Sequence, residues 1–136
     1  MIIEKWKNAC AYTIGKYHIS TNLPCQDRTL YLEANGVKVM TLADGAGSEE
    51  NSHIGATIVC EEMAKLLTTN FDDYLMYFEN QIDNAFAHKK SMNILSNIII
   101  NNLVQKLKFE AARCNFTLKE LSSTLLFFAI RDNRYI

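Results

Sequence analysis

An Asn35-Gly36 dipeptide between two apolar-rich segments constrains the fold of this 136-residue chain more than any other feature. Asn-Gly is the strongest short hairpin signal, because both central residues of a type I′ turn need a positive φ. Residues 28–34 alternate apolar and polar side chains before the turn, and residues 37–43 return after it. Because both faces of the second segment are mostly apolar, we expect it to be a central strand that is buried on both sides.

The other segments predict further strands and helices within one domain. Apolar residues recur at helical spacing over residues 54–67, 74–86 and about 91–114, and Thr69 or Asn70 is the expected cap of the second helix. Short β-branched and aromatic runs predict strands at residues 9–15 and 122–130. A turn follows the second of these runs, so we expect the chain to end inside a hairpin.

Composition limits the kinds of partner. Fourteen basic and fifteen acidic residues give a net charge of −1, which provides no field for nucleic acid or an anionic membrane. The longest apolar run, residues 125–130, is far too short to span a bilayer. The four cysteines are widely spaced and the first residues do not resemble a signal peptide. We therefore expect a cytoplasmic protein with reduced thiols and with neither a nucleic-acid nor a membrane partner.

The turn after residues 37–43 contains the first candidate site. Asp44 directly follows the expected buried strand and leads into Gly45, Ala46, Gly47 and Ser48. The end of a rigid strand suits a metal ligand or an acid–base group, and glycines allow a carbonyl to approach a ligand closely. A plain tight turn is the alternative, because Asp-Gly is a common turn dipeptide.

Asp27 is the second candidate, because it is placed symmetrically to Asp44 about the hairpin turn. Asp27 lies eight residues before Asn35, and Asp44 lies eight residues after Gly36. The hairpin therefore predicts two carboxylates side by side, which repel each other unless a proton or a cation lies between them. Carboxylates without His or Cys favour hard cations such as Mg²⁺ or Mn²⁺. A turn-capping role for Asp27 is the alternative.

Four segments of the chain carry recognisable motifs in order. They read GKYHISTNLPCQDR, VKVMTLADGAGS, NSHIGATIVCEEMAKLL and SSTLLFFAIRDNRYI. Together they resemble the metal-dependent PP2C-type (PPM family) serine/threonine protein phosphatases, most closely bacterial forms with a Gln-Asp motif followed by an Asp-Gly-x-Gly-Ser turn. The resemblance implies an α/β (α+β) fold in which helices flank a two-sheet β-sandwich.

The resemblance also implies a function and a site. Members of the family hydrolyse phosphoserine and phosphothreonine in proteins, with two Mg²⁺ or Mn²⁺ ions that activate a water molecule. By motif, Asp44 and the Gly45 carbonyl would be metal ligands. Asp27 would hold a metal ion or its bound water, so both aspartates are catalytic candidates. Gln26 stands where many members of the family have Glu.

The phosphate-binding residue is less clearly marked than the metal ligands. Many members of the family place an Arg a few residues before the acidic pair, whereas residues 20–23 contain none here. His18 is the substrate-binding candidate, and Lys16 and Arg28 are alternatives. A solvated histidine at a strand end is the other interpretation of His18.

Family members continue beyond the motifs present here, and their remaining metal-ligating aspartates come from a Gly-Asp-Gly turn and later segments. The resemblance therefore implies that residues 1–136 are the N-terminal part of a PP2C-like domain, with part of the two-metal site. A non-catalytic pseudophosphatase or binding module is one alternative, and an inactive fragment of a longer phosphatase is another. A reading frame that continues into such aspartates would favour the enzyme. The last strand would lack a ladder partner, which predicts self-association.

Overall fold

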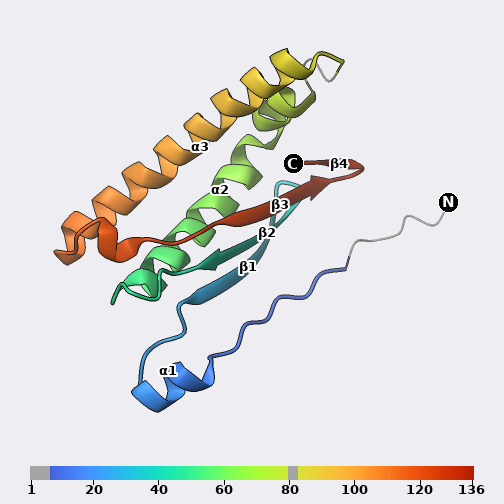
Figure 1. Ribbon diagram of the computed structural model, residues 1–136. Coiled ribbons are helices and arrows are strands. Elements are labelled where there is room, and N and C mark those ends of the chain that lie inside the picture. Colours follow the sequence, from blue (N-terminus) through green and yellow to red (C-terminus); the bar gives the residue numbers. More distant parts are fainter. Residues whose placement is uncertain (1–6, 80–82) are drawn as a thin grey trace.

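The computed structural model describes residues 7–79 and 83–136, which form one antiparallel sheet with two long helices beside it (Figure 1). The elements follow in the order α1 (Lys16–Thr21), β1 (Asp27–Ala34), β2 (Val37–Asp44), α2 (Ser52–Glu79), α3 (Ala85–Cys114), the 3-10 helix η1 (Lys119–Leu121), β3 (Leu126–Arg131) and β4 (Arg134–Tyr135). The strand order is β1-β2-β3-β4, and each strand is antiparallel to its neighbour. The expected α+β class is confirmed.

The predicted hairpin is present, and its turn has the expected backbone. Asn35 and Gly36 have φ values of 53° and 72°. β1 pairs with β2 in unbroken register from Ala34↔Val37 to Asp27↔Asp44. The Asn35 side chain also donates a hydrogen bond to the Thr68 carbonyl of α2 at 3.0 Å. The turn therefore sets the register of the sheet and also attaches the sheet to a helix.

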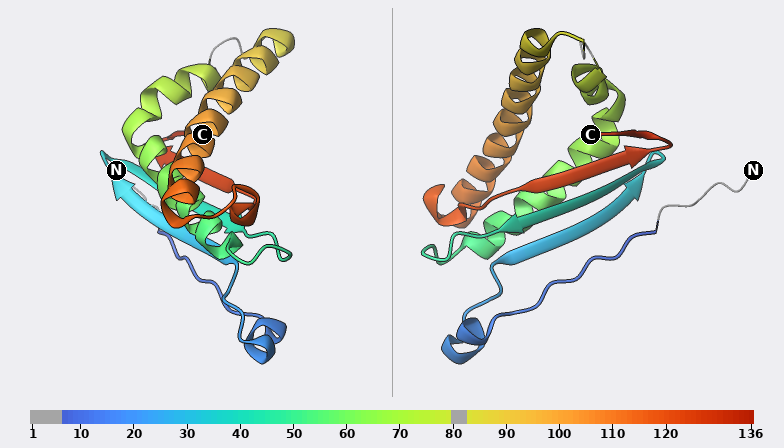
Figure 2. Two further views of the ribbon diagram at one scale, coloured as in Figure 1. Left: turned by 90° about the vertical axis from the view of Figure 1, so that its left-hand side faces the viewer. Right: turned by 45° about the vertical axis from the view of Figure 1, so that its right-hand side comes forward.

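One face of the sheet forms the core together with α2. Every second residue of β2 is buried on this side, namely Val37, Val39, Thr41 and Ala43. α2 lies along the same face and contributes the fully buried Met63 and Leu67. α3 packs mainly against α2, and Figure 2 shows α2 running along the sheet with α3 beside it.

The other face of the sheet is open, so the expectation that β2 is buried on both sides is wrong. Met40 and Leu42 of β2 are 36% and 44% exposed, and Leu126 of β3 is 67% exposed. We call this surface the outer face; by register it also carries Tyr31 and Phe128. The prediction failed because an apolar strand face has the same residue pattern whether or not a second layer covers it.

Residues 9–15 do not form the predicted strand. They are exposed and have no regular structure, and α1 follows them. A hollow of about 320 Å³ is lined jointly by residues 9–11 and by outer-face residues such as Met40 and Leu126. A strand needs a hydrogen-bonded neighbour, and none of the described strands pairs with this segment. Its β-branched and aromatic residues are therefore insufficient to make it a strand.

The helices differ from the prediction at their boundaries. α2 continues to Glu79 and bends at Asn70, whose φ of −115° and ψ of 24° are not helical. The expected cap is therefore a kink inside one long helix. Phe86 belongs to α3, whose N-cap Asn84 accepts a hydrogen bond from the N–H of Ala87 at 3.1 Å. Ile82, which was expected in the second helix, lies outside the described residues.

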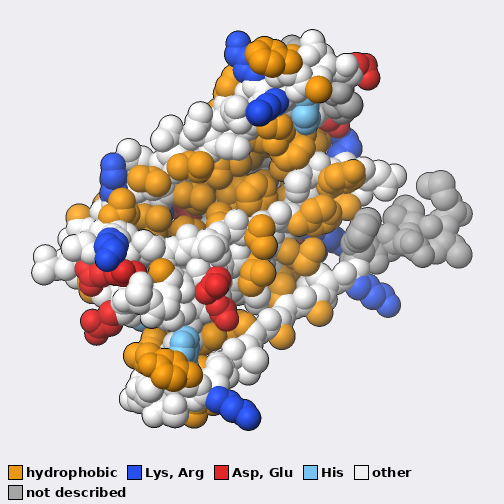
Figure 3. All heavy atoms as spheres, viewed as in Figure 1, with side chains coloured by type: hydrophobic (Ala, Val, Ile, Leu, Met, Phe, Trp, Pro, Cys, Tyr) orange, Lys and Arg blue, Asp and Glu red, His pale blue; other side chains and the backbone are white. Residues whose placement is uncertain are grey.

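α3 buries only part of its apolar surface. Leu95, Ile99 and Leu103 are buried, whereas Ile94 and Ile100 are exposed. Figure 3 shows hydrophobic side chains gathered in a band between the sheet and α3. Among the described residues, no helix combines the length and the apolar content that crossing a bilayer requires.

Gly55 marks a very close approach of α2 to η1, and this contact yields a testable prediction. A Cβ at position 55 would overlap the carbonyl oxygen of Leu121, which is itself buried. We expect Gly55→Ala to lower the free energy of unfolding by about 1–3 kcal/mol, because two backbone segments would have to separate. Thermal unfolding followed by circular dichroism measures the effect. Gly15→Ala is the control, since a Cβ there meets nothing within 4 Å. Equal midpoints for the two variants would contradict the close contact.

Candidate functional site

Asp27 and Asp44 lie opposite each other at the open end of the β1–β2 hairpin. They form the last pair of the register, and both are exposed. Side chains alternate between the two faces of a strand, and Ala43 is buried against the helices, so both aspartates project from the outer face. The symmetric arms counted in the sequence therefore bring the two residues together as predicted.

The two carboxylates are close enough to affect each other. The pKa of Asp27 is raised above its usual value, first by partial desolvation and then by the hydrogen bond and the negative charge of Asp44. His18 acts in the opposite direction and lowers the pKa of Asp27. His18 therefore lies within electrostatic range of Asp27, although it belongs to α1, a helix that the sequence did not predict. Two anionic groups in this arrangement favour a proton or a cation nearby.

The main chain of Asp44 is held by the segment that leads into β3. The N–H of Asp44 donates to the hydroxyl oxygen of Thr124 at 3.0 Å, and the N–H of Thr124 donates to the Asp44 carbonyl at 2.8 Å. Two residues further on, the N–H of Ala46 donates to the Ser122 carbonyl at 2.9 Å. Residues 122–124 thus run beside the end of β2 and fix the backbone from which the Asp44 side chain projects.

Gly45 is buried where the chain leaving β2 passes the start of α2. A Cβ at this position would lie 2.8 Å from Ser52 Oγ and 2.9 Å from the Gln26 carbonyl oxygen, so a larger residue does not fit without a shift. The N–H of Gly45 donates to the same Gln26 carbonyl at 3.0 Å. Close backbone approach therefore explains this glycine. The role of its carbonyl as a metal ligand stays a prediction.

The donor atoms at this end of the hairpin suit a hard cation only in part. Carboxylate oxygens are typical ligands of Mg²⁺ and Mn²⁺, and Mg²⁺ requires about six oxygen donors. Within residues 7–79 and 83–136, no group of three or more His, Cys, Asp and Glu side chains is arranged to hold a metal ion. Asp27 and Asp44 would therefore supply part of a coordination shell, and water or other oxygen atoms would complete it.

The other residues singled out by the sequence have different positions. His18 is half-buried, whereas Arg28, one of its alternatives, donates a hydrogen bond to the Tyr12 hydroxyl at 2.9 Å. Gln26 is buried and its side chain is bonded to main-chain groups of the loop after Asp44. Sequence reasoning missed the structural roles of Gln26 and Thr124. The available signal for Thr124 was the matched segment SSTLLFFAIRDNRYI, which contains it, and Gln26 was marked only by its departure from Glu.

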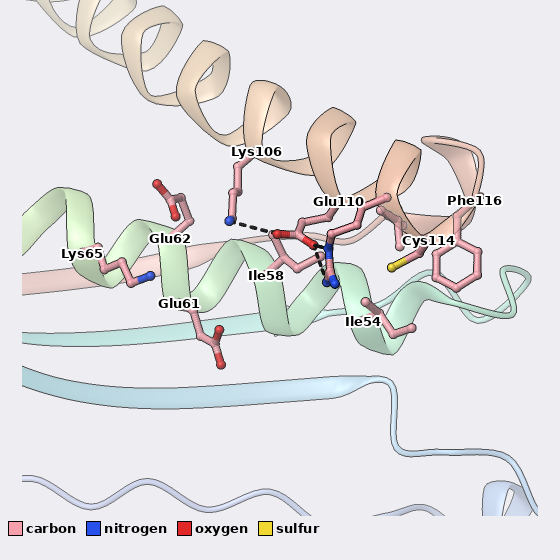
Figure 4. A pocket seen from close by; sticks show the side chains of 11 residues that line it. Ile54, Ile58, Glu61, Glu62, Lys65, Lys106, Glu110, Cys114 and Phe116 are labelled. Carbon is pink, nitrogen blue, oxygen red and sulfur yellow. Dashed lines mark hydrogen bonds and ion pairs between the residues drawn. The ribbon is translucent and has the colours of Figure 1, made fainter.

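A separate cleft of about 210 Å³ lies between α2 and α3, and its lining contains no predicted site residue. Figure 4 shows Lys106 and Glu110 of α3 pointing toward each other there. Glu110 is paired with Lys106 at 3.0 Å and with Arg113 at 2.7 Å, and these contacts lower the pKa of Glu110. Because these three charges already neutralise one another in part, they are poorly available to a ligand.

The raised pKa of Asp27 predicts that the aspartate pair weakens the fold when no cation is bound. A carboxyl with a higher pKa in the folded chain binds its proton more tightly there, so stability falls as the pH rises through that pKa. In EDTA, we expect Asp44→Asn to raise the unfolding midpoint by about 2 °C at pH 7 and by less at about pH 4, where the carboxyls are partly protonated. The effect is small because exposed charge pairs contribute little to stability.

Differential scanning calorimetry at both pH values measures this effect. Asp73→Asn is the control, because it removes an exposed carboxylate of α2 that is distant in sequence from the pair. A midpoint for Asp44→Asn that is unchanged or lower at neutral pH would show that the two carboxylates do not repel each other appreciably.

Comparison with known proteins connects this geometry to a family. A family model described as Protein phosphatase 2C matches residues 14–136, a range that includes both aspartates, the chain after β2 and all four strands. Neither a curated protein nor a solved structure matched the chain. Because the family model covers most of the sequence, the chain belongs to the protein phosphatase 2C family.

Proposed function

We propose that Asp27, Asp44 and the Gly45 carbonyl belong to the metal centre of a phosphatase that acts on phosphoserine or phosphothreonine in proteins. The family match supports a phosphatase function in general. The observation that carries the finer proposal is the pairing of Asp27 with Asp44 at the exposed end of the hairpin. Bound Mg²⁺ or Mn²⁺ would relieve the repulsion between these carboxylates.

Each residue has a task that follows from its position. Divalent cations, when bound, polarise phosphoryl oxygens and lower the pKa of water. Asp44 and Asp27 would hold the cations at the edge of the outer face, and the bonds between the Asp44 main chain and Thr124 fix the backbone from which the Asp44 carboxylate projects. His18 is the proposed phosphate contact, because it lies within electrostatic range of Asp27 and an imidazole N–H is a suitable donor to phosphate oxygen.

The proposed substrate is a phosphoprotein, and the proposed location is the cytoplasm of a bacterial cell. Cys10, Cys25, Cys60 and Cys114 are free thiols, which is typical of proteins from a reducing compartment. The bacterial assignment rests on the Gln-Asp motif and the Asp-Gly-x-Gly-Ser turn.

Hydrolysis of p-nitrophenyl phosphate and of a phosphothreonine peptide by the natural gene product tests the function. We expect turnover with Mn²⁺ or Mg²⁺, no turnover in excess EDTA, and complete loss in Asp44→Ala. Asp27→Asn is expected to lower activity by about 10–100-fold, as is typical of residues that act through a bound water. Asp73→Ala is the control. Undiminished turnover in Asp44→Ala would overturn the assignment.

The 136 residues by themselves provide a second arm of the same test. Two carboxylates and one carbonyl leave a hard cation mostly hydrated, so we expect weak Mn²⁺ binding by calorimetry and no phosphate release. Micromolar binding at two sites with steady turnover would show that other carboxylates, such as Asp83 or Asp132, complete the centre. Metal binding without hydrolysis by the natural gene product would favour the non-catalytic alternative.

We also propose that the chain self-associates through β3 and the outer face. The structure corrects part of the earlier expectation, because β4 and Ile136 do pair with the last residues of β3. Leu126, at the other end of β3, is 67% exposed and has its described ladder partner, Leu42, on one side only. An exposed strand edge next to an apolar face favours pairing with a second copy.

Sedimentation velocity over a range of concentrations tests this association. We expect the parent chain to form dimers as its concentration rises, and Leu126→Lys to remain monomeric, because a charge at the outer face opposes burial. Phe109→Lys is the control, since Phe109 is 63% exposed on α3. A parent chain that is monomeric throughout would contradict the proposal, as would dimers that Leu126→Lys leaves intact.

A further inference from the structure

Gln26 is a buried polar residue next to the proposed metal ligands. It is 8% exposed and directly precedes Asp27, whose own side chain is exposed. Its main-chain carbonyl accepts the hydrogen bond from the N–H of Gly45 at 3.0 Å. The two neighbouring residues, Gln26 and Asp27, therefore differ sharply in their surroundings.

The Gln26 side chain is bonded to the loop that follows Asp44. Its amide nitrogen donates to the Glu49 carbonyl at 3.1 Å and to the Ala46 carbonyl at 3.5 Å. The Glu49 carbonyl also accepts a hydrogen bond from the N–H of Ser52, the first residue of α2. Gln26 thus connects the beginning of β1 to residues 45–49 and, through them, to the beginning of α2.

These contacts require an amide rather than a carboxylate. Both partners are carbonyl oxygens, which accept hydrogen bonds and cannot donate them, and the Gln amide offers two N–H donors. A glutamate at this position would place a buried negative charge against two carbonyl oxygens. Burying an unpaired charge is costly, so the loop would have to open or the side chain would have to turn outward.

We propose that Gln26 is a positioning residue, which holds residues 45–49 in place beside the Asp27–Asp44 pair, and that it is not itself a metal ligand. The inference rests on the proposed metal centre at Asp27 and Asp44. The two roles predict opposite effects of Gln26→Glu. A residue facing the cation would become a better ligand as Glu, whereas a residue supporting the loop would lose its function.

The test compares Gln26→Glu and Gln26→Met with the natural gene product. Mn²⁺ affinity is measured from the electron paramagnetic resonance signal of free Mn²⁺, and loop order is measured by amide hydrogen exchange over residues 45–52. We expect Gln26→Glu to weaken Mn²⁺ binding by about 10-fold or more, as loss of a supporting residue does in other metal sites. Exchange over residues 45–52 should accelerate in both variants, because neither retains an amide donor.

Gln105→Glu is the matched control, because it makes the same chemical change at an exposed position of α3. Thermal unfolding separates positioning from a general effect on the fold: a purely structural residue would lower the midpoint and leave the Mn²⁺ affinity of the folded variant unchanged. That outcome would overturn the proposal, as would tighter Mn²⁺ binding in Gln26→Glu or unchanged exchange in Gln26→Met. If the parent protein binds no Mn²⁺, the proposed metal centre fails, while the exchange data still decide whether Gln26 holds the loop.

Discussion

The pairing of β1 with β2 is fixed by the two-residue turn at Asn35 and Gly36, and the position of both candidate carboxylates depends on that pairing. A slip of one residue would separate Asp27 from Asp44 and would move a whole set of β2 side chains from one face to the other. Burial of alternate residues along β2 opposes such a slip, because it would expose the core face of the strand. The bond from Asn35 to α2 adds a second constraint at the turn itself.

The candidate site is held together mainly through the backbone. Asp44 is bonded to Thr124 through its own N–H and carbonyl, and Gly45 is bonded to the carbonyl of Gln26. The side chains of Asp27 and Asp44 remain exposed beyond this framework. This arrangement leaves the carboxylates available to a ligand. Three separate segments of the chain fix the main chain that carries them, and a functional site needs such support to keep its geometry.

Features determined by neighbours in sequence could be predicted, and features determined by distant partners could not. The Asn35-Gly36 turn, the symmetric placement of Asp27 and Asp44, and the buried positions of α3 follow from local pattern. Residues 9–15 lack a strand partner in the described sheet, although they were predicted to be a strand. Met40 lacks a covering layer there, although its strand was predicted to be buried on both sides. The hydrogen bonds of Thr124 and Gln26 also depend on tertiary approach, which periodicity does not encode. The catalytic and metal-binding roles of Asp27 and Asp44 stay predictions.

The contact between Thr124 and Asp44 spans 80 residues of sequence, and this separation affects when the site can be completed during synthesis. The β1–β2 hairpin is local and can form soon after it leaves the ribosome. The bonds that fix the chain around Asp44 cannot form until residues 122–124 have been made and the helices between the two segments have folded. Contacts of such high sequence separation form late and slowly. The hairpin alone brings the two carboxylates together, whereas the bonds that fix the Asp44 main chain depend on residues made about 80 positions later.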